Sequence, residues 1–277
     1  MERYLLLILV YFLCAFSCTR PVPVPEPVPP EPVIPPEPVE PPEPSHKEVN
    51  LMSAFTEDFS SRETENFSFY SVVPEKDFHY YSGFPSLTET GKTILLLRAN
   101  PADDGGDNGG AIISTRDYVH YGSYSARIRM PDVGAVQPKA ALFADFSLRD
   151  DDPVFGFDEF TLEFRVADKN NLYSRVSRRG PDAGENPSVQ ESVLTPSSSF
   201  NAASKFYVYG MDWTQDKVTW WLQTSSSSEK TILYEWTENI PSEPLKLEFR
   251  LYHDKANPAL YPYELEIDWI KYTPSAI

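Results

Sequence analysis

Two glutamates on one short segment are the residues best suited to chemistry in this sequence. Residues 157–166 read FDEFTLEFRV, so apolar and polar side chains alternate. A period of two is typical of a β-strand and places Glu159, Thr161 and Glu163 on one face. At ~3.3 Å per residue, the Cα atoms of the two glutamates lie roughly 13 Å apart. Side chains that lean toward each other bring the carboxyl groups near the ~5–5.5 Å separation that suits a nucleophile and an acid/base in retaining glycoside hydrolysis.

The N-terminus of the chain predicts export. An apolar run from Tyr4 to Phe16 is too short to span a bilayer comfortably and is followed by Ser17-Cys18. Residues 1–18 therefore have the pattern of a lipoprotein signal peptide, with Cys18 as the lipid-bearing residue and Cys14 as a poorer alternative. A plain cleaved secretory signal is the competing interpretation. With a lipid anchor, we expect a membrane-anchored lipoprotein of the bacterial envelope, in the periplasm or at the cell surface.

Residues 19–47 predict a disordered stalk. Proline alternates with valine and glutamate over residues 21–44, a composition that favours polyproline II. At ~3.1 Å per residue this stretch extends some 70 Å, which makes it a spacer behind the anchor. A ligand for a proline-recognition domain is the alternative.

Charge and cysteine content exclude several classes of function. The formal net charge is −17, which repels phosphate backbones, so nucleic acid is not an expected partner. Both cysteines lie in the leader, and the folded part therefore has no disulfide, thiolate metal site or cysteine nucleophile. We expect a monomer that contacts the membrane only through its lipid.

Residues 48–277 predict one all-β domain. Short alternating runs recur between clusters of Gly, Pro, Ser and Asp, and no long segment has a helical period. This pattern indicates a β-sandwich or jelly roll of antiparallel sheets. The predicted strands are Ile94–Arg98, Tyr124–Met130, Glu159–Val166, Phe206–Asp212, Val218–Gln223, Leu245–Tyr252 and Leu265–Tyr272.

Several of these segments, in their order along the chain, resemble glycoside hydrolase family 16. They are Gly122–Pro131, Phe206–Trp213, Val218–Trp221, Asn257–Tyr261 and Ile267–Tyr272, and the resemblance covers most of residues 55–273. The family consists of concanavalin A-like jelly-roll enzymes of the lichenase and laminarinase type, which cleave β-glucans and related polysaccharides. The resemblance implies two curved antiparallel sheets and a polysaccharide partner held in a concave cleft. The chain therefore resembles a divergent member of glycoside hydrolase family 16.

The resemblance also assigns roles at the glutamate segment. The family motif is Glu-x-Asp-x-Glu, and here it reads Glu159-Phe160-Thr161-Leu162-Glu163. By resemblance, Glu159 is the nucleophile and Glu163 the general acid/base. Thr161 stands where the family has an aspartate. It can donate one hydrogen bond to Glu159 but brings no negative charge and cannot shuttle a proton.

Five further residues are candidates for sugar binding. Phe157 precedes Asp-Glu where lichenases carry a tryptophan, and Arg175 and Arg250 align with sugar-contacting asparagines. Tyr252 replaces another tryptophan, and alternation turns Trp221 away from its neighbour Trp220 and so makes Trp221 the candidate for an exposed aromatic.

The two arginines have three interpretations. Unpaired in the cleft, they would grip a carboxylate or sulfate of an acidic polysaccharide. Paired with Glu159 or Glu163, they would hold those carboxylates ionised and disable the acid. On strand edges, they would be solvated surface residues. The leading hypothesis is a retaining endo-β-glycosidase, and the alternative is a catalytically impaired glycan-binding or envelope-structural protein; a protein-interaction module on the same sheet is a third possibility.

No cofactor is required for this chemistry, but the resemblance suggests a structural calcium ion. Asp268 matches the family aspartate that binds it, with the carbonyl groups of Asp58 and Gly91 as further donors. Oxygen ligands suit calcium.

Overall fold

The computed structural model describes most of the chain after the proline-rich segment: residues 47–61, 64–71, 78–82, 93–99, 110–132, 142–152, 155–179, 188–253 and 262–275. The chain divides into Met1–Glu43 and Pro44–Ile277, and all the described residues belong to the second unit. The predicted signal peptide with Cys18, nearly all of the stalk, and Gly91 lie outside them. Within the described ranges, no helix is long and apolar enough to cross a membrane.

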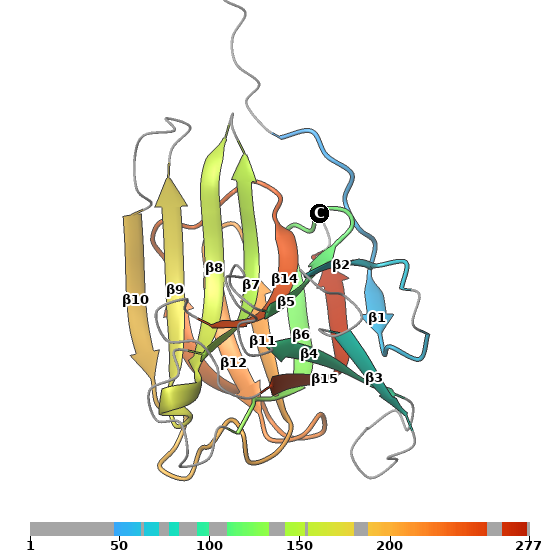
Figure 1. Cartoon of the computed structure of the whole chain (residues 1–277). Coiled ribbons are helices and arrows are strands. Elements are labelled where there is room, and N and C mark those ends of the chain that lie inside the picture. Colours follow the sequence, from blue (N-terminus) through green and yellow to red (C-terminus); the bar gives the residue numbers. More distant parts are fainter. Residues whose placement is uncertain are drawn as a thin grey trace, which may run out of the picture. The chain divides into compact units, whose positions relative to one another are not determined.

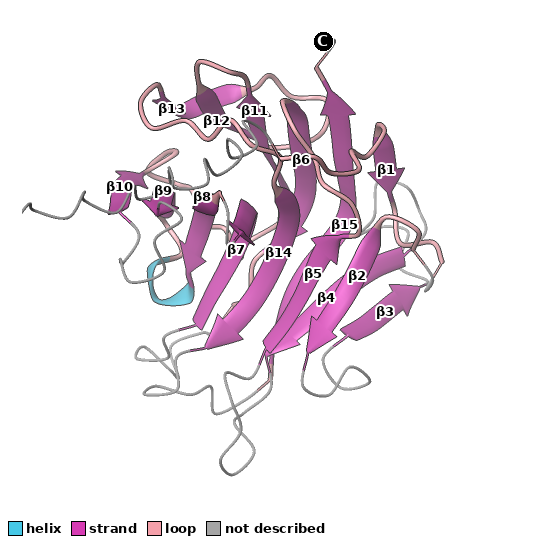
Figure 2. Cartoon of the chain, turned by 90° about the horizontal axis from the view of Figure 1, so that it is seen from above, coloured by secondary structure: helices cyan, strands magenta, loops and turns pink. Residues whose placement is uncertain are grey.

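The described part of the chain forms two antiparallel sheets, as the sequence predicts (Figures 1 and 2). In order across the eight-stranded sheet, the strands are β13 (Thr231–Trp236), β12 (Val218–Gln223), β11 (Tyr207–Trp213), β6 (Gly122–Arg129), β15 (Tyr263–Pro274), β4 (Thr93–Ala99) and β3 (Phe78–Ser82), with β1 (Phe55–Glu57) also paired to β15. In the seven-stranded sheet they are β10 (Ser188–Leu194), β9 (Leu172–Arg179), β8 (Gly156–Arg165), β7 (Leu142–Asp152), β14 (Lys246–His253), β5 (Gly110–Thr115) and β2 (Phe67–Ser71). A short 3-10 helix, η1 (Val166–Asp168), follows β8.

Each of the seven alternating runs found in the sequence lies mainly within a strand. Val218–Gln223 matches β12 at both ends, and the others differ from their strands by one to three residues at an end. The glutamate segment is β8, near the middle of the seven-stranded sheet, with β7 and β9 as its neighbours. The prediction of a two-sheet all-β sandwich is confirmed.

Alternation along the strands of the seven-stranded sheet separates the core from a polar face. Phe146 of β7, Phe160 of β8 and Phe249 of β14 are fully buried in the main hydrophobic cluster between the sheets. Phe146 stacks on Phe249 with ring centroids 4.9 Å apart and meets Trp220 of the other sheet edge-on at 5.5 Å. Burial of each such ring contributes about 1.5–3 kcal/mol. Because successive side chains of a strand point to opposite sides, the neighbours of these rings are turned onto the other face.

The structure corrects the prediction for Trp221. This residue lies on β12 of the eight-stranded sheet, and its exposed fraction is only 3%. Alternation does turn it away from Trp220, but it packs in a cluster with Val208 and Trp269, and the Lys230 ammonium lies 3.9 Å from the centroid of its ring. The prediction that Trp221 is an exposed aromatic is therefore wrong, because neighbouring strands supply apolar partners that cover the ring. It also belongs to the sheet that does not carry the glutamates.

The close approach of Gly210 to Trp221 gives a stability prediction. A Cβ atom at Gly210 would lie 2.0 Å from Cζ2 of the tryptophan ring. We expect Gly210→Ala to lower the free energy of unfolding by about 1–3 kcal/mol, since the buried ring has to shift. Urea denaturation measures the change. Ser125→Ala, at the cross-strand partner of Gly210 on β6, is the control. Equal stability of Gly210→Ala and the unchanged protein would contradict the packing described here.

Candidate active site

Strand register lines up charged side chains in rows across the seven-stranded sheet. In one row, successive cross-strand partners on β14, β7, β8 and β9 are Arg250, Asp145, Glu163 and Tyr173. In the next row, from β14 to β10, they are Glu248, Ser147, Thr161, Arg175 and Glu191. Directly opposed side chains have Cβ atoms about 4.5–5.5 Å apart, so each row is a line of contacts. We call this surface, which also carries Arg149, Glu159 and Arg165, the polar face.

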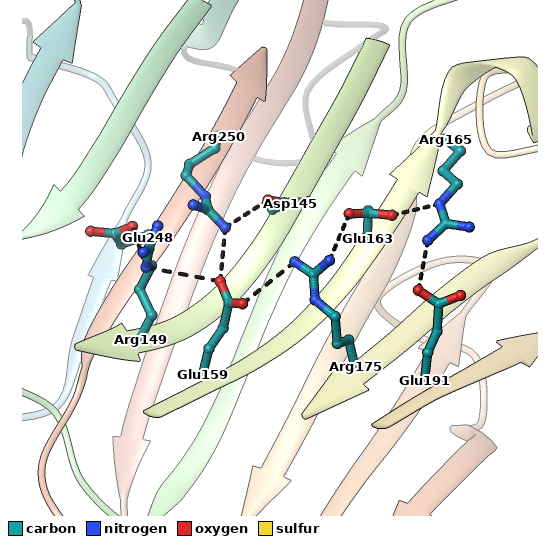
Figure 3. Close-up of polar contacts among 9 residues, drawn as sticks. All are labelled: Asp145, Arg149, Glu159, Glu163, Arg165, Arg175, Glu191, Glu248 and Arg250. Atoms are coloured by element: carbon teal, nitrogen blue, oxygen red, sulfur yellow. Dashed lines mark hydrogen bonds and ion pairs between the residues drawn. The ribbon is translucent and has the colours of Figure 1, made fainter. Parts of the chain in front are cut away.

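Glu159 is surrounded by three arginines (Figure 3). Arg250 donates to its Oε1 at 3.0 Å, and Arg175 donates to its Oε2 at 3.4 Å. Nε of Arg149 lies 3.8 Å from Oε1. The side chain of Glu159 is only 5% exposed, whereas that of Arg175 is 23% exposed. The arginines therefore lie between the predicted nucleophile and solvent.

Glu163 is paired in the same way. Nε of Arg165 donates to its Oε1 at 2.6 Å, and Nη1 of Arg175 donates to its Oε2 at 3.4 Å. One guanidinium, that of Arg175, thus bridges the two predicted catalytic carboxylates (Figure 3). Arg165 is held in turn by Glu191, at 2.6 Å. Of the three interpretations of Arg175 and Arg250, the structure shows the pairing with Glu159 and Glu163.

Thr161 does not make the hydrogen bond to Glu159 that its side chain could donate. It is fully buried between Ser147 and Arg175, its cross-strand neighbours. Within the part of the chain that the structure describes, its Oγ1 has no hydrogen-bond partner. The possible hydrogen bond from Thr161 to Glu159 is therefore not formed.

Asp145 is a third carboxylate at this site, and the sequence reasoning missed it. Oδ2 of Asp145 lies 2.7 Å from Nη2 of Arg250, the same atom that donates to Glu159. Neither oxygen of Asp145 has a well-aligned hydrogen bond among the described residues, so this contact is an ion pair. The pKa of Asp145 is raised to about 6, chiefly by burial; Arg250 opposes the shift, and Glu163 and Glu159 add to it. The signal was present in the sequence, because Phe143, Asp145, Ser147 and Arg149 alternate with apolar residues on β7.

Aromatic side chains flank the charged rows. Tyr252 stacks on Phe143 with ring centroids 5.4 Å apart. The Cζ atom of Arg165 lies 3.6 Å from the centroid of the Tyr173 ring. Phe157 is near the start of β8, and the guanidinium of Arg149 lies 5.3 Å from the centroid of its ring. The structure thus brings the sugar-binding candidates Phe157, Tyr252, Arg175 and Arg250 onto the face that carries the glutamates. Tyr173 and Phe143 are additional residues that the sequence analysis did not select.

Asp268, the predicted calcium ligand, lies on the eight-stranded sheet and is fully buried. Its Oδ2 accepts a hydrogen bond from Nη1 of Arg127 at 2.7 Å. A guanidinium already supplies the positive charge that a calcium ion would bring. The described ranges also contain no group of three or more His, Cys, Asp or Glu side chains placed to hold a metal. The predicted calcium ion stays a prediction, because Gly91, one of its carbonyl donors, lies outside the described residues.

The fold and the site define the class as antiparallel jelly-roll proteins with two glutamates on one face of a strand near the middle of a sheet. Residues 75–271 match the profile of "Glycosyl hydrolases family 16". The chain belongs to this family. It is 22% identical over 241 residues to a beta-glucanase of Brevibacillus brevis, which covers 83% of this chain and 85% of the relative.

Other relatives are more distant or larger. The chain is 26% identical over 166 residues to Crh-like protein 2 of Aspergillus fumigatus, but it spans only 31% of that protein. Among solved structures, the β-glucanase of Bacillus licheniformis has a TM-score of 0.60 at 15% identity, covering 82% of this chain and 100% of that one. A GH16 protein of Bacteroides ovatus has a TM-score of 0.59 at 14% identity, covering 79% and 99%. These likenesses confirm the jelly-roll fold.

The pairing of Asp268 with Arg127 predicts the effect of a chelator. We expect excess EDTA to leave the melting temperature unchanged, because no calcium is needed to neutralise Asp268. Thermal unfolding with EDTA, and with calcium added back, measures this. A fall in the melting temperature that calcium reverses would support a structural calcium ion at Asp268.

The raised pKa of Asp145 predicts how stability depends on pH. The folded protein binds this proton more readily than the unfolded chain does, so the associated stability is fully present below about pH 4 and is lost as the pH rises through about 6. Relative to Asp145→Asn, we expect the free energy of unfolding to fall by on the order of 3 kcal/mol across that interval. Urea denaturation of both proteins at several pH values tests the sign. A difference that rises or stays flat over this interval would refute it.

Proposed function

We propose that this protein binds a neutral β-glucan on the polar face and that ion pairs suppress hydrolysis there. The observation that carries the proposal is the pairing of Glu163 with Arg165 and Arg175. The hydrogen bonds are those of an ionised carboxylate, whereas a general acid has to carry a proton.

Access to the nucleophile supports the same conclusion. In a retaining mechanism, one carboxylate attacks the anomeric carbon while the other protonates the leaving oxygen. Glu159 is almost completely covered, and Arg250 and Arg175 hold its two oxygens. Attack would require both guanidinium groups to move, and Thr161 offers no charge or proton in compensation. The site therefore has the two carboxylates in the positions of the family chemistry, but arginines hold both of them.

The charge of the site favours a neutral sugar chain over a polyanion. The network contains five carboxylates and four arginines: Asp145, Glu159, Glu163, Glu191, Glu248, Arg149, Arg165, Arg175 and Arg250. An acidic polysaccharide would have to compete with these carboxylates and approach a chain of net charge −17. Planar carboxylate and guanidinium groups also offer acceptors and donors to hydroxyls, and the flanking rings offer apolar contact. The beta-glucanase relative points to β-glucan as the class.

Retaining hydrolysis is the second candidate function. Glu159 and Glu163 lie on one face and share the guanidinium of Arg175, which places them as partners. A sugar that displaced Arg175 would uncover both carboxylates together. This candidate keeps Glu159 as nucleophile and Glu163 as acid/base.

The anchor is part of the proposal as well. A lipid on Cys18 and a stalk over residues 19–47 would hold the binding domain, as a monomer, away from an envelope membrane. Such a placement suits a protein that captures polysaccharide outside the cell or in the periplasm.

Binding and hydrolysis can be measured side by side. We expect the purified protein to bind one or more β-glucans in a panel of neutral and acidic polysaccharides and to release no reducing ends. Glu163→Gln should change the affinity by less than about threefold, because glutamine still accepts hydrogen bonds from Arg165 and Arg175. Tyr252→Ala should weaken binding by about tenfold, since it removes an apolar surface beside the site. Isothermal titration and a reducing-sugar assay provide the two readouts.

The controls separate the two candidate functions. Ile232→Ala changes an exposed residue of β13, on the other sheet, and should bind like the unchanged protein. Reducing-end release that disappears in Glu159→Gln would establish the hydrolase instead. Failure to bind any polysaccharide in the panel would overturn both.

A further inference from the structure

Asp145 occupies a position between the charged groups that define the polar face. On β7 it is the direct cross-strand partner of Arg250 on β14 and of Glu163 on β8. Its side chain is fully buried, so it touches no glycan itself. Any effect of Asp145 on glycan binding therefore has to act through the neighbouring side chains.

The groups that face Asp145 come from both flanking strands and from the strand beyond. Arg250 and Tyr252 approach from β14, Glu159 and Glu163 from β8, and Arg175 from β9. Arg250 is the group in closest ionic contact, and one of its nitrogens, Nη2, lies 2.7 Å from Asp145 and 3.0 Å from Glu159. A buried guanidinium needs anionic partners, and these two carboxylates supply them.

We propose that Asp145 is a positioning residue that holds Arg250 in the place from which it donates to Glu159. This deepens the function proposed above and rests on it only for the glycan readout. A single nitrogen of Arg250, Nη2, contacts both Asp145 and Glu159 (Figure 3). Loss of the charge on Asp145 leaves the guanidinium with one carboxylate fewer and loosens its orientation on the polar face.

Protonation is the natural way to remove that charge. Because burial raises the pKa of Asp145 to about 6, the carboxyl gains its proton under mildly acidic conditions that leave ordinary carboxylates ionised. Arg250 then keeps its charge while the carboxyl group that holds it becomes neutral. The arrangement of the site should therefore depend on pH through a residue that contacts no ligand.

Asp145→Asn tests this role, with Asp158→Asn as its matched control. Asp158 is also a buried aspartate with a pKa raised by burial, and it pairs with Arg178 at 2.7 Å. It lies on β8 next to Glu159 but points to the opposite face. Both substitutions remove one titrating carboxyl and keep its size, but only one of them adjoins Arg250.

The first readout is the affinity for a β-glucan oligosaccharide as a function of pH. We expect affinity to fall by about tenfold from about pH 7.5 to about pH 5 in the unchanged protein and in Asp158→Asn. Asp145→Asn should bind weakly at every pH, without this transition. A role in stability alone would lower the melting temperature of Asp145→Asn and leave its pH profile unchanged, and that result would overturn the proposal.

The second readout needs no glycan and so separates the two proposals. Carbon NMR of the glutamate carboxyl groups follows Glu159, assigned by comparison with Glu159→Gln. Its signal should show an inflection near pH 6 in the unchanged protein that is absent in Asp145→Asn. If this inflection is seen and no glucan binds, the proposed function fails and the role of Asp145 stands. If the inflection is missing, or persists in Asp145→Asn, the role of Asp145 is refuted whatever the glycan result.

Discussion

The polar face of the seven-stranded sheet depends on one constraint: charges that are taken out of water must find opposite charges on neighbouring strands. Antiparallel register places Arg250, Asp145 and Glu163 side by side, and Arg175 between the two glutamates. Leaving one of these charges unpaired costs several kcal/mol. The chain therefore needs nearly equal numbers of arginines and carboxylates here, and these arginines hold the two motif glutamates.

Because of this constraint, membership of the family does not by itself establish the reaction of the family. Residues 75–271 match the glycosyl hydrolase profile, and both motif glutamates stand on one face of the expected strand. A fold of this kind accommodates many activities, and the side chains at the site decide among them. Here Arg165 and Arg175 hold Glu163, and Thr161 replaces a titrating residue with one that lacks a hydrogen-bond partner among the described residues. The same strand can therefore carry both motif glutamates while arginines hold them in ion pairs.

Asp145 shows how a buried carboxylate can influence a surface that it does not reach. Its neighbours on both flanking strands are charged, and its contact with Arg250 joins it to Glu159. Desolvation makes its ionisation sensitive to mild acid, while the pairing with Arg250 keeps the cost of burial tolerable. Arg250 is thus positioned by a buried residue on β7, a strand that the sequence analysis did not identify.

Local sequence determined the strands and their faces, because the alternation of apolar and polar side chains is a property of each segment. It identified β8, the face shared by Glu159 and Glu163, and the two-sheet class. The alternation along β7 also indicated that Asp145 lies on the polar face, but the sequence analysis did not use it. Only the tertiary structure decided that Arg175 and Arg250 pair with the glutamates, that Trp221 is covered, and that Arg127 neutralises Asp268. These contacts join strands distant in the sequence, and their register follows from the folding of the whole sheet.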